Sequence, residues 1–452
     1  MALKFYNTLT HKKQVFKPLR DKRVGLYTCG PTVYSYAHIG NLRTYIFEDI
    51  LRRVLEYSSY NVKHIMNITD VEDKIIRDSK TVGKTIFEFV KLYEKAFFSD
   101  LKKLNIKPAY TYPKATEHIK EMITIIGLLL KKKLAYKAND SIYFDVSKFK
   151  KYGQLSGVKT RELKIGARVD ADEYTKNEAE DFVLWKAKKT GEPSWEAPFG
   201  SGRPGWHIEC SAMSMKYLGT SFDIHAGAVD LIFPHHENEI AQSEGATGKK
   251  FVTYFIEGEH LLVNSKKMSK SLGSMYTLRD ILNKGFDPIA FRYLVLTAHY
   301  RSKLNFTWES MASAGNALKK LRETFENLKK SREQLNKKIL NQYKKRFEGY
   351  INDDLNTPRA LALLWEVLKS EKINSETKYE ITNNFEEILG LRLRGIKLEK
   401  TGIPEKIIAL VKKREKYRKE NNFTASDELR KKIESLGWMI EDTILGPKTK
   451  KI

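Results

Sequence analysis

An alternation of strand and helix patterns near the amino terminus restricts the fold of this chain more than any other feature. It consists of an apolar run at residues 24–29, a Gly-Pro turn, a helical pattern at 46–58 and a second apolar run at 62–67. Strand, glycine-containing turn, helix and strand in this order open a βαβ unit, in which the two strands pair in parallel. Because parallel sheets bind ligands at the carboxyl ends of their strands, we expect an α/β protein with Cys29 and His38 at its ligand-binding edge.

The pattern of expected helices and strands then changes in a way that indicates an insertion. A helix pattern at 119–130 and a strand pattern at 141–146 are followed by a charged, turn-rich stretch, before strand and loop patterns resume. We therefore expect the sheet domain to be split by other structure. The expected division is a sheet domain at 1–112 and 198–244, an insertion at 113–197 and a connecting region at 245–305.

Beyond residue 305 the pattern is helical. Thr307 can cap a helix whose apolar positions recur at spacings of three and four, namely Met311, Ala314, Leu318, Leu321, Phe325 and Leu328. Thr357, followed by Pro358, is expected as the N-cap of a further helix with proline at its first position. These signals predict a helical bundle at 306–395.

A linker after the bundle leads to a small basic unit at 404–452. Within it we expect a helix that begins at a Thr424 cap and ends near Gly437, because glycine is common just after a helix. This unit is rich in Lys and Arg, which suits contact with nucleic acid but equally suits a solvated amphipathic helix.

The charge of the whole chain favours a polyanionic partner. The 81 Lys and Arg residues exceed the 56 Asp and Glu residues, giving a formal net charge of +25. Such an excess binds nucleic acid through counterion release, although a generally Lys-rich composition would give the same count.

The apolar segments and the cysteine content indicate the cellular compartment. The longest apolar stretch, at 122–130, is far shorter than the roughly 20 residues that cross a bilayer, and residues 1–20 hold no apolar segment of secretory type. Cys29 and Cys210 are too few for a disulfide framework, which indicates a reducing compartment. We expect a cytoplasmic protein with no membrane partner.

Two short motifs indicate a nucleotide site. Residues 38–41 are His-Ile-Gly-Asn at the expected start of a helix, where unpaired N–H groups, a close backbone at Gly40 and the His38 ring can meet phosphate oxygens. A histidine in a surface turn would give the same tetrapeptide. Residues 267–271 are Lys-Met-Ser-Lys-Ser, in which two ammonium groups can gather the oxygens of a triphosphate on a loop able to close.

A possible metal site involves both cysteines. Cys29, Cys210 and the run His235-His236-Glu237-Asn238-Glu239 offer the thiolate, imidazole and carboxylate ligands of a tetrahedral Zn²⁺ site. Spacing alone does not choose between His235 and His236 or between Glu237 and Glu239. Two buried free cysteines would explain the same residues without a metal.

A family resemblance joins these motifs. The strings CGPTVYSYAHIGN, NITDVEDKII, GWHIECSAMS, DLIFPHHENEIAQS, KKMSKSLG and DDLNTPRA resemble the cysteinyl-tRNA synthetases, a family of class I aminoacyl-tRNA synthetases. The fourth position of the first motif is Asn41 rather than histidine, which the family tolerates. The chain also departs from the family at Ala226 and Ala228, where glycine is usual, and at Glu72, where aspartate is expected. The resemblance implies a Rossmann-like catalytic domain with an insertion, followed by a helical bundle and a small C-terminal unit.

The resemblance also implies roles for individual residues. Catalysis falls to His38, Asn41, Lys267 and Lys270; ATP binding to His38, Gly40, Asn41, Asp230 and Lys270; cysteine binding to Thr69, Trp206 and His225; and one Zn²⁺ per subunit to Cys29, Cys210, His235 and Glu239. Core packing for Trp206 and His225 and helix capping for Asp230 are the alternatives to these roles.

The implied reaction is ATP-dependent and AMP-forming. Cysteine, ATP with Mg²⁺ and tRNA(Cys) are the implied partners of a cysteine–tRNA ligase, with Zn²⁺ selecting the substrate thiolate over a serine hydroxyl. The basic C-terminal unit is implied to reach the anticodon, and we expect a monomer. Two rival hypotheses remain: a ligase that transfers cysteine to an amine-bearing sugar, and a nonenzymatic RNA-binding scaffold.

Overall fold

A four-stranded parallel sheet forms the centre of the computed structural model, which describes residues 2–158, 168–169, 181–268, 274–328, 333–394, 404–443 and 446–451. Its strand order is β11 (Val252–Gly258), β10 (Phe222–Ala228), β3 (Arg23–Thr28) and β4 (Asn61–Met66), and all three pairings are parallel. Helix α1 (Ile39–Tyr57) connects β3 to β4. This confirms the α/β fold class and the βαβ unit expected from the sequence.

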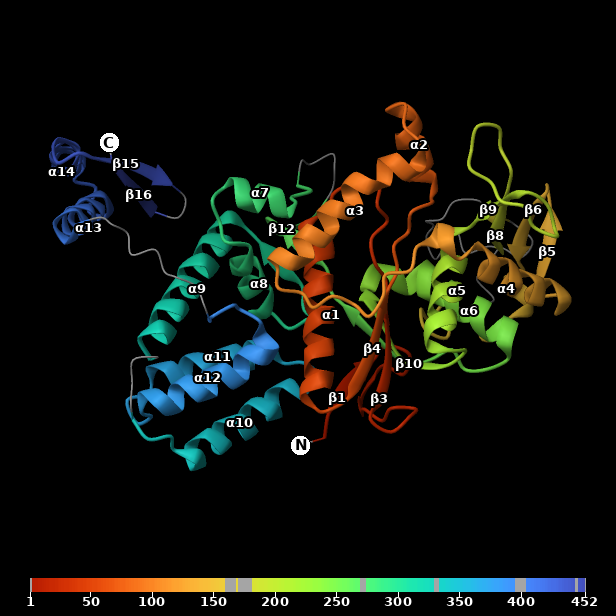
Figure 1. Cartoon of the computed structure of the whole chain (residues 1–452), viewed down its shortest axis with the longest axis horizontal. Coiled ribbons are helices and arrows are strands. Elements are labelled where there is room, and N and C mark those ends of the chain that lie inside the picture. The colour runs from red at the N-terminus through yellow and green to blue at the C-terminus, as the bar shows by residue number, and fades with distance from the viewer. Residues whose placement is uncertain are drawn as a thin grey trace.

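Helices cover the sheet from two sides. Figure 1 shows α1 on one side of the strands and α5 (Trp206–Leu218) and α6 (Glu237–Thr247) on the other. The buried face of α1 carries apolar residues such as Leu42, Ile46 and Ile50, which recur at the three- and four-residue spacing of one helix face. The helix is therefore held against the core, with its amino end directed to the carboxyl edge of the sheet.

A second sheet lies between β4 and β10 in the chain. It comprises β5 (Ala135–Ala138), β6 (Ser141–Phe144), β8 (Asp181–Ala187), β7 (Arg168–Val169) and β9 (Gly202–Pro204). Helix α4 (Ile119–Lys131) contacts α5 and α6, which joins this sheet to the central one. The predicted helix at 119–130 and strand at 141–146 are thus present, while most of the turn-rich stretch after them lies outside the described residues.

The remaining elements of the first 306 residues surround the central sheet. They are the hairpin β1 (Lys4–Asn7) and β2 (Lys12–Val15), helices α2 (Asp73–Thr81), α3 (Ile86–Lys103), α7 (Leu278–Asn283) and α8 (Pro288–Leu296), and strands β12 (Leu261–Val263), β13 (Lys266–Lys267) and β14 (Leu304–Phe306). Strands β13, β12 and β14 form a sheet of their own, which carries the start of the Lys-Met-Ser-Lys-Ser motif.

Four helices form the bundle: α9 (Trp308–Leu328), α10 (Lys337–Ile351), α11 (Thr357–Lys369) and α12 (Ser375–Leu389). All six apolar positions predicted for α9 are buried, and the Thr307 hydroxyl accepts the Ser310 N–H at 3.0 Å, which confirms the predicted cap. The N-cap predicted at Thr357 is wrong by one residue, because the Asn356 side chain accepts the Arg359 N–H and Thr357 is the first residue of the helix.

The C-terminal unit contains α13 (Glu405–Lys419), α14 (Phe423–Ser435), β15 (Trp438–Thr443) and β16 (Gly446–Lys451). Its core consists of Ile407, Ile433 and Ile440 with a few partly buried neighbours. The cap predicted at Thr424 is wrong, because the Asn422 side chain accepts the Ala425 N–H. Gly437 follows the helix with a φ of 79°, as predicted.

Within the described ranges, no helix combines the length and apolar character needed to cross a membrane.

Candidate active site and metal centre

The amino end of α1 is closed by reciprocal hydrogen bonds between His38 and Asn41. The Nδ1 atom of His38 accepts the Asn41 N–H at 3.1 Å, and the Asn41 Oδ1 atom accepts the His38 N–H at 3.2 Å. Burial lowers the pKa of His38, against the opposing influence of Asp230. Because Nδ1 is an acceptor in a neutral ring, the ring proton is on Nε2. His38 Nε2–H and the Asn41 side-chain amide are therefore donors for an anion at the helix amino end.

Gly40 permits a close contact between this helix end and the lysine motif. A Cβ atom at residue 40 would lie 2.4 Å from Cε of Met268 and 2.9 Å from Nδ1 of His38. Both distances are below any normal contact, so a side chain here would displace Met268 or the His38 ring. The two motifs expected to hold a nucleotide thus lie side by side.

A cleft of about 370 Å³ opens at this place. Its lining includes Cys29, His38, Gly40, Asn41, Trp206, Asp230, Lys267 and Met268. Lys267 and Asp230 are exposed at its walls, and Asp230 lies in the short turn Val229–Leu231. Lys270 lies outside the described residues. The cleft has the polar and apolar groups that a nucleotide and a small amino acid require.

Four of the candidate metal ligands meet beside the cleft, and one of them, Cys29, lines it. One atom from each of Cys29, Cys210, His235 and Glu239 lies within 4.8 Å of the others, and all four residues are buried. Cys29 follows β3, Cys210 is on α5, His235 precedes α6 and Glu239 is in the first turn of α6. The fold therefore assembles them from three separate segments at one sheet edge.

A second group overlaps the first. Cys29, His225, His236 and Glu239 also have atoms within 4.8 Å of one another. The His225 Nε2 atom lies 3.1 Å from Oε2 of Glu239, and the His236 ring lies 2.9 Å from Glu257 through Nδ1 and 3.5 Å from the Cys29 sulfur through Nε2. Cys29 and Glu239 belong to both groups, so the choice between His235 and His236 stays open on geometry.

The two glutamates have different surroundings. The Glu237 carboxylate accepts the N–H groups of Gly153, Leu155 and Ser156 at 2.7–3.1 Å. It therefore holds the loop of the second sheet and faces away from the cysteines. Glu239 is two residues later, on nearly the opposite side of the helix, and lies in the cluster.

The chemistry of the Cys29, Cys210, His235 and Glu239 group fits zinc. Burial raises the pKa of the Cys29 thiol, as does the adjacent Cys210, so a thiolate pair at this position needs a cation beside it. Burial lowers the pKa of His235 and leaves its ring neutral, with a lone pair for a metal. Two sulfurs, one imidazole nitrogen and one carboxylate oxygen are a ligand set typical of tetrahedral Zn²⁺.

Trp206 connects the cluster to the cleft. Its ring stacks on His235 with centroids 4.2 Å apart and an interplanar angle of 29°, and it lines the cleft. Thr69 and His225 are buried and do not line that cleft: the Thr69 hydroxyl donates to Glu209 at 3.1 Å, and His225 pairs with Glu239. Substrate contact by these two residues stays a prediction.

Sequence reasoning missed other residues of the cleft. Glu259 and His260 line it directly after β11, and Glu72 and Lys74 line it at the start of α2. The rule that placed Cys29 at the carboxyl edge of β3 also applies to Glu259 after β11, so that residue could have been found. No comparable sequence pattern predicts that Glu72 and Lys74 line the cleft.

Known proteins are similar to this chain over its full length. The family described as "tRNA synthetases class I (C) catalytic domain" matches residues 15–316. A cysteine–tRNA ligase of Protochlamydia amoebophila (strain UWE25) is 47% identical over 100% of this chain and 98% of its own length. One of Thermococcus onnurineus (strain NA1) is 44% identical, covering 100% of both chains.

Solved structures support the fold alone. The methionyl-tRNA synthetase of Mycobacterium tuberculosis, in complex with methionyl-adenylate, has a TM-score of 0.58 and 13% identity over 82% of this chain and 90% of its own. The LeuRS of Agrobacterium radiobacter K84, in a ternary complex with tRNA, has a TM-score of 0.60 and 10% identity over 83% and 84%. From the full-length identity to curated relatives and the matching catalytic domain, the chain belongs to the cysteine–tRNA ligase family of class I tRNA synthetases.

Proposed function

We propose that this protein activates cysteine with ATP and transfers it to the 3′ end of tRNA(Cys). The observation that carries the proposal is a group of thiol-binding residues, Cys29, Cys210, His235 and Glu239, beside a cleft that Cys29, His38, Asn41 and Lys267 line. Groups suited to sulfur and groups suited to phosphate then lie next to each other, as the activation of cysteine requires.

In the first step the cysteine carboxylate attacks the α-phosphorus of ATP, and the bond to the β-phosphate oxygen breaks. Cysteinyl-adenylate and pyrophosphate are the products. The His38 Nε2–H group, the Asn41 amide and the amino end of α1 donate to phosphate oxygens, while Lys267 and Lys270 stabilise the charge that develops on the leaving pyrophosphate. Asp230 accepts from the ribose hydroxyls. These groups position the reactants and form no covalent intermediate.

Selection of cysteine falls to the group beside the cleft. We assign Cys29, Cys210, His235 and Glu239 as the ligands of one zinc ion. Bound there, zinc would supply a soft Lewis acid that binds a thiolate and lowers its pKa, which a serine hydroxyl does not match. Trp206 forms an apolar wall against the short side chain of the substrate and holds the His235 ring in orientation through its stacking contact.

In the second step a ribose hydroxyl at the tRNA 3′ end attacks the carbonyl carbon of the adenylate, and AMP leaves. The net charge of +25 and the basic C-terminal unit favour tRNA binding. We assign this unit to the anticodon end of the tRNA. Because Cys29 and Cys210 are both free, a reducing compartment suits the protein, and we propose a cytoplasmic monomer.

Cysteine-dependent ATP–pyrophosphate exchange tests the first step. The full chain is assayed with cysteine and with serine, before and after chelation and after zinc is added back. We expect exchange with cysteine and none with serine. Exchange with cysteine should be lost on chelation and restored when zinc is added back. Exchange that survives complete zinc removal would contradict the assigned ligand role, and no exchange with cysteine under any condition would favour the RNA-binding scaffold.

Acceptor use tests the second step. The full chain, preloaded with cysteinyl-adenylate, is offered a tRNA(Cys) transcript or an amine-bearing sugar. We expect transfer to the transcript as an ester. Amide formation with the sugar and none with the transcript would instead support the rival ligase.

A further inference from the structure

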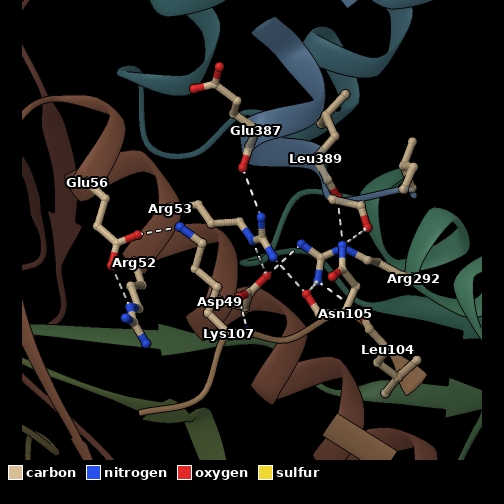
Figure 2. Close-up of polar contacts among 12 residues, drawn as sticks. Asp49, Arg52, Arg53, Glu56, Leu104, Asn105, Lys107, Arg292, Glu387 and Leu389 are labelled. Atoms are coloured by element: carbon tan, nitrogen blue, oxygen red, sulfur yellow. Dashed lines mark hydrogen bonds and ion pairs between the residues drawn. The ribbon is translucent and has the colours of Figure 1, made fainter. Parts of the chain in front are cut away.

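Helix α1 carries a buried ionic cluster in its carboxyl-terminal half, away from the cleft at its amino end. One carboxylate oxygen of Asp49 accepts hydrogen bonds from two arginines: Oδ2 lies 2.6 Å from Arg53 Nε and 2.6 Å from Arg292 Nη2 (Figure 2). Its other oxygen accepts the Lys107 N–H at 2.8 Å. Arg53 is one helical turn from Asp49, whereas Arg292 belongs to α8. All three charged side chains are buried, which fixes the geometry of the pairs.

The remaining donors of this cluster close the carboxyl end of α12. Arg53 Nη1 donates to the Glu387 carbonyl at 2.9 Å, and Arg292 Nε donates to the Leu389 carbonyl at 2.7 Å (Figure 2). Asn105 Nδ2 donates to the Gly390 carbonyl at 2.9 Å. The last carbonyls of a helix have no partner within the helix, and they form the negative end of its dipole. A helix of the bundle is therefore capped by side chains that lie outside the bundle.

The contact with Gly390 leaves little freedom at this junction. Gly390 has a φ of 61°, and a Cβ atom there would lie 2.8 Å from Arg292 Nη2. The two arginines also donate to the carbonyls at the end of α3, Arg53 to Asn105 at 2.7 Å and Arg292 to Leu104 at 3.2 Å. Hydrogen bonds of these two arginines thus link the ends of α3 and α12 to α1 and α8.

Helix α1 connects this junction directly to the reaction site. Its amino end supplies His38 and Asn41 to the cleft, and Figure 1 shows the whole helix between the central sheet and the bundle. A helix is stiff over this length, so the position of α12 relative to the cleft depends on how α12 is attached to α1. The bundle leads in turn to the basic C-terminal unit.

We infer that Asp49, Arg53 and Arg292 are positioning residues for the transfer step. They fix the bundle relative to α1, so that a tRNA held by the basic C-terminal unit brings its 3′ end into the cleft. The inference rests on the proposed function, since it concerns tRNA transfer. It separates the two half-reactions, because cysteine and ATP are held without the bundle.

The test compares the two half-reactions in matched variants. Arg53→Met removes the caps on Glu387 and Asn105 and leaves one carboxylate paired with one arginine, so no buried charge is stranded. Gly390→Ala disturbs the same junction from the bundle side. Arg346→Met is the control: it removes an arginine that pairs with Glu366 at 2.6 Å on the exposed surface of the bundle.

We expect cysteine-dependent exchange within about twofold of wild type for Arg53→Met and Gly390→Ala. Transfer to tRNA should fall by roughly 10- to 100-fold, the range associated with a misplacement of reacting groups by about 1 Å. Arg346→Met should leave both steps unchanged. Hydrogen exchange of the folded variants should rise at residues 386–393 and stay constant at residues 38–45.

Loss of both steps in equal proportion would overturn the inference, since the cluster would then support only the stability of the catalytic sheet. Unchanged transfer with increased hydrogen exchange at 386–393 would overturn it as well. If Arg53→Met does not fold, Gly390→Ala decides on the same criteria. Failure of the wild type to exchange with cysteine would instead reject the proposed function.

Discussion

The ring of Trp206 stacks on the ring of His235 with centroids 4.2 Å apart, so one wall of the cleft is also a wall of the metal-ligand cluster. A small substrate that contacts this tryptophan is within reach of the ligand atoms behind it. The residues proposed to select the amino acid and those proposed to bind the nucleotide are therefore neighbours, and we expect changes to the two groups to have distinguishable effects.

Replacing the two neighbouring glutamates separates metal binding from loop anchoring. Glu239→Gln should lower zinc affinity by more than the roughly 10- to 100-fold that follows loss of an outer hydrogen-bond partner, because a ligand itself is changed. Glu237→Gln should keep zinc and loosen the loop at Gly153–Ser156 that Glu237 holds. Metal analysis after dialysis checks both variants. Equal zinc content in the two would contradict the assignment of Glu239.

Replacing His38 by asparagine separates capping from catalysis. Asparagine is a strong N-cap, so the free energy of unfolding of His38→Asn should be within about 0.5 kcal/mol of the wild-type value. That of His38→Ala should be lower by about 1 kcal/mol. Both variants lack the Nε2–H donor, and both should lower the exchange rate by roughly 10²-fold with little change in the KM for cysteine. Urea unfolding measures the change in stability, and cysteine-dependent ATP–pyrophosphate exchange measures the change in activity. A His38→Asn enzyme with full activity would show that the histidine serves only as a cap.

His64 should make the protein acid-sensitive. Burial lowers the pKa of His64 from 6.5 to about 3, and its Nε2 atom lies 2.9 Å from the Thr28 hydroxyl. Between these pH values the unfolded chain binds the extra proton, so stability falls as pH drops from 6.5 toward 3 and is constant above 6.5. A shift of this kind amounts to about 2 kcal/mol at pH 5.

The matched variant for this effect is His64→Gln, which has no proton to bind. The difference in unfolding free energy between wild type and His64→Gln, measured in urea at pH 7 and pH 5, should change by about 2 kcal/mol in favour of the variant at the lower pH. A difference that does not vary with pH would mean that His64 has the same pKa in the folded and unfolded chain.

Much of the fold follows from local pattern. The βαβ unit, the six buried positions of α9 and the helix stop at Gly437 arise from periodicity and turn residues that lie close together in the chain. The two wrong caps have a local cause too. Asn356 precedes Thr357 and Asn422 precedes Thr424, and both residue types cap helices, so propensity alone does not choose between them.

The sequence indicates which types of residue form the site, but it identifies only some of the individual residues. The Glu237 carboxylate is taken by backbone N–H groups of Gly153 and Ser156, far away in the chain, and no short-range pattern announces such a contact. The same holds for the arginines that cap α12, because Arg53 and Arg292 meet that helix only through the tertiary fold. Long-range hydrogen bonds are where the sequence is least informative.

The four residues proposed as zinc ligands lie far apart in the chain. Cys29 precedes the strands of the second sheet, whereas Cys210, His235 and Glu239 follow them. During synthesis no nascent chain that ends before residue 239 holds the complete set, and the first cysteine waits for more than half of the protein to leave the ribosome. A product that ends before residue 239 therefore lacks at least one of the four residues, and the last strand of the central sheet, β11, follows them in the chain.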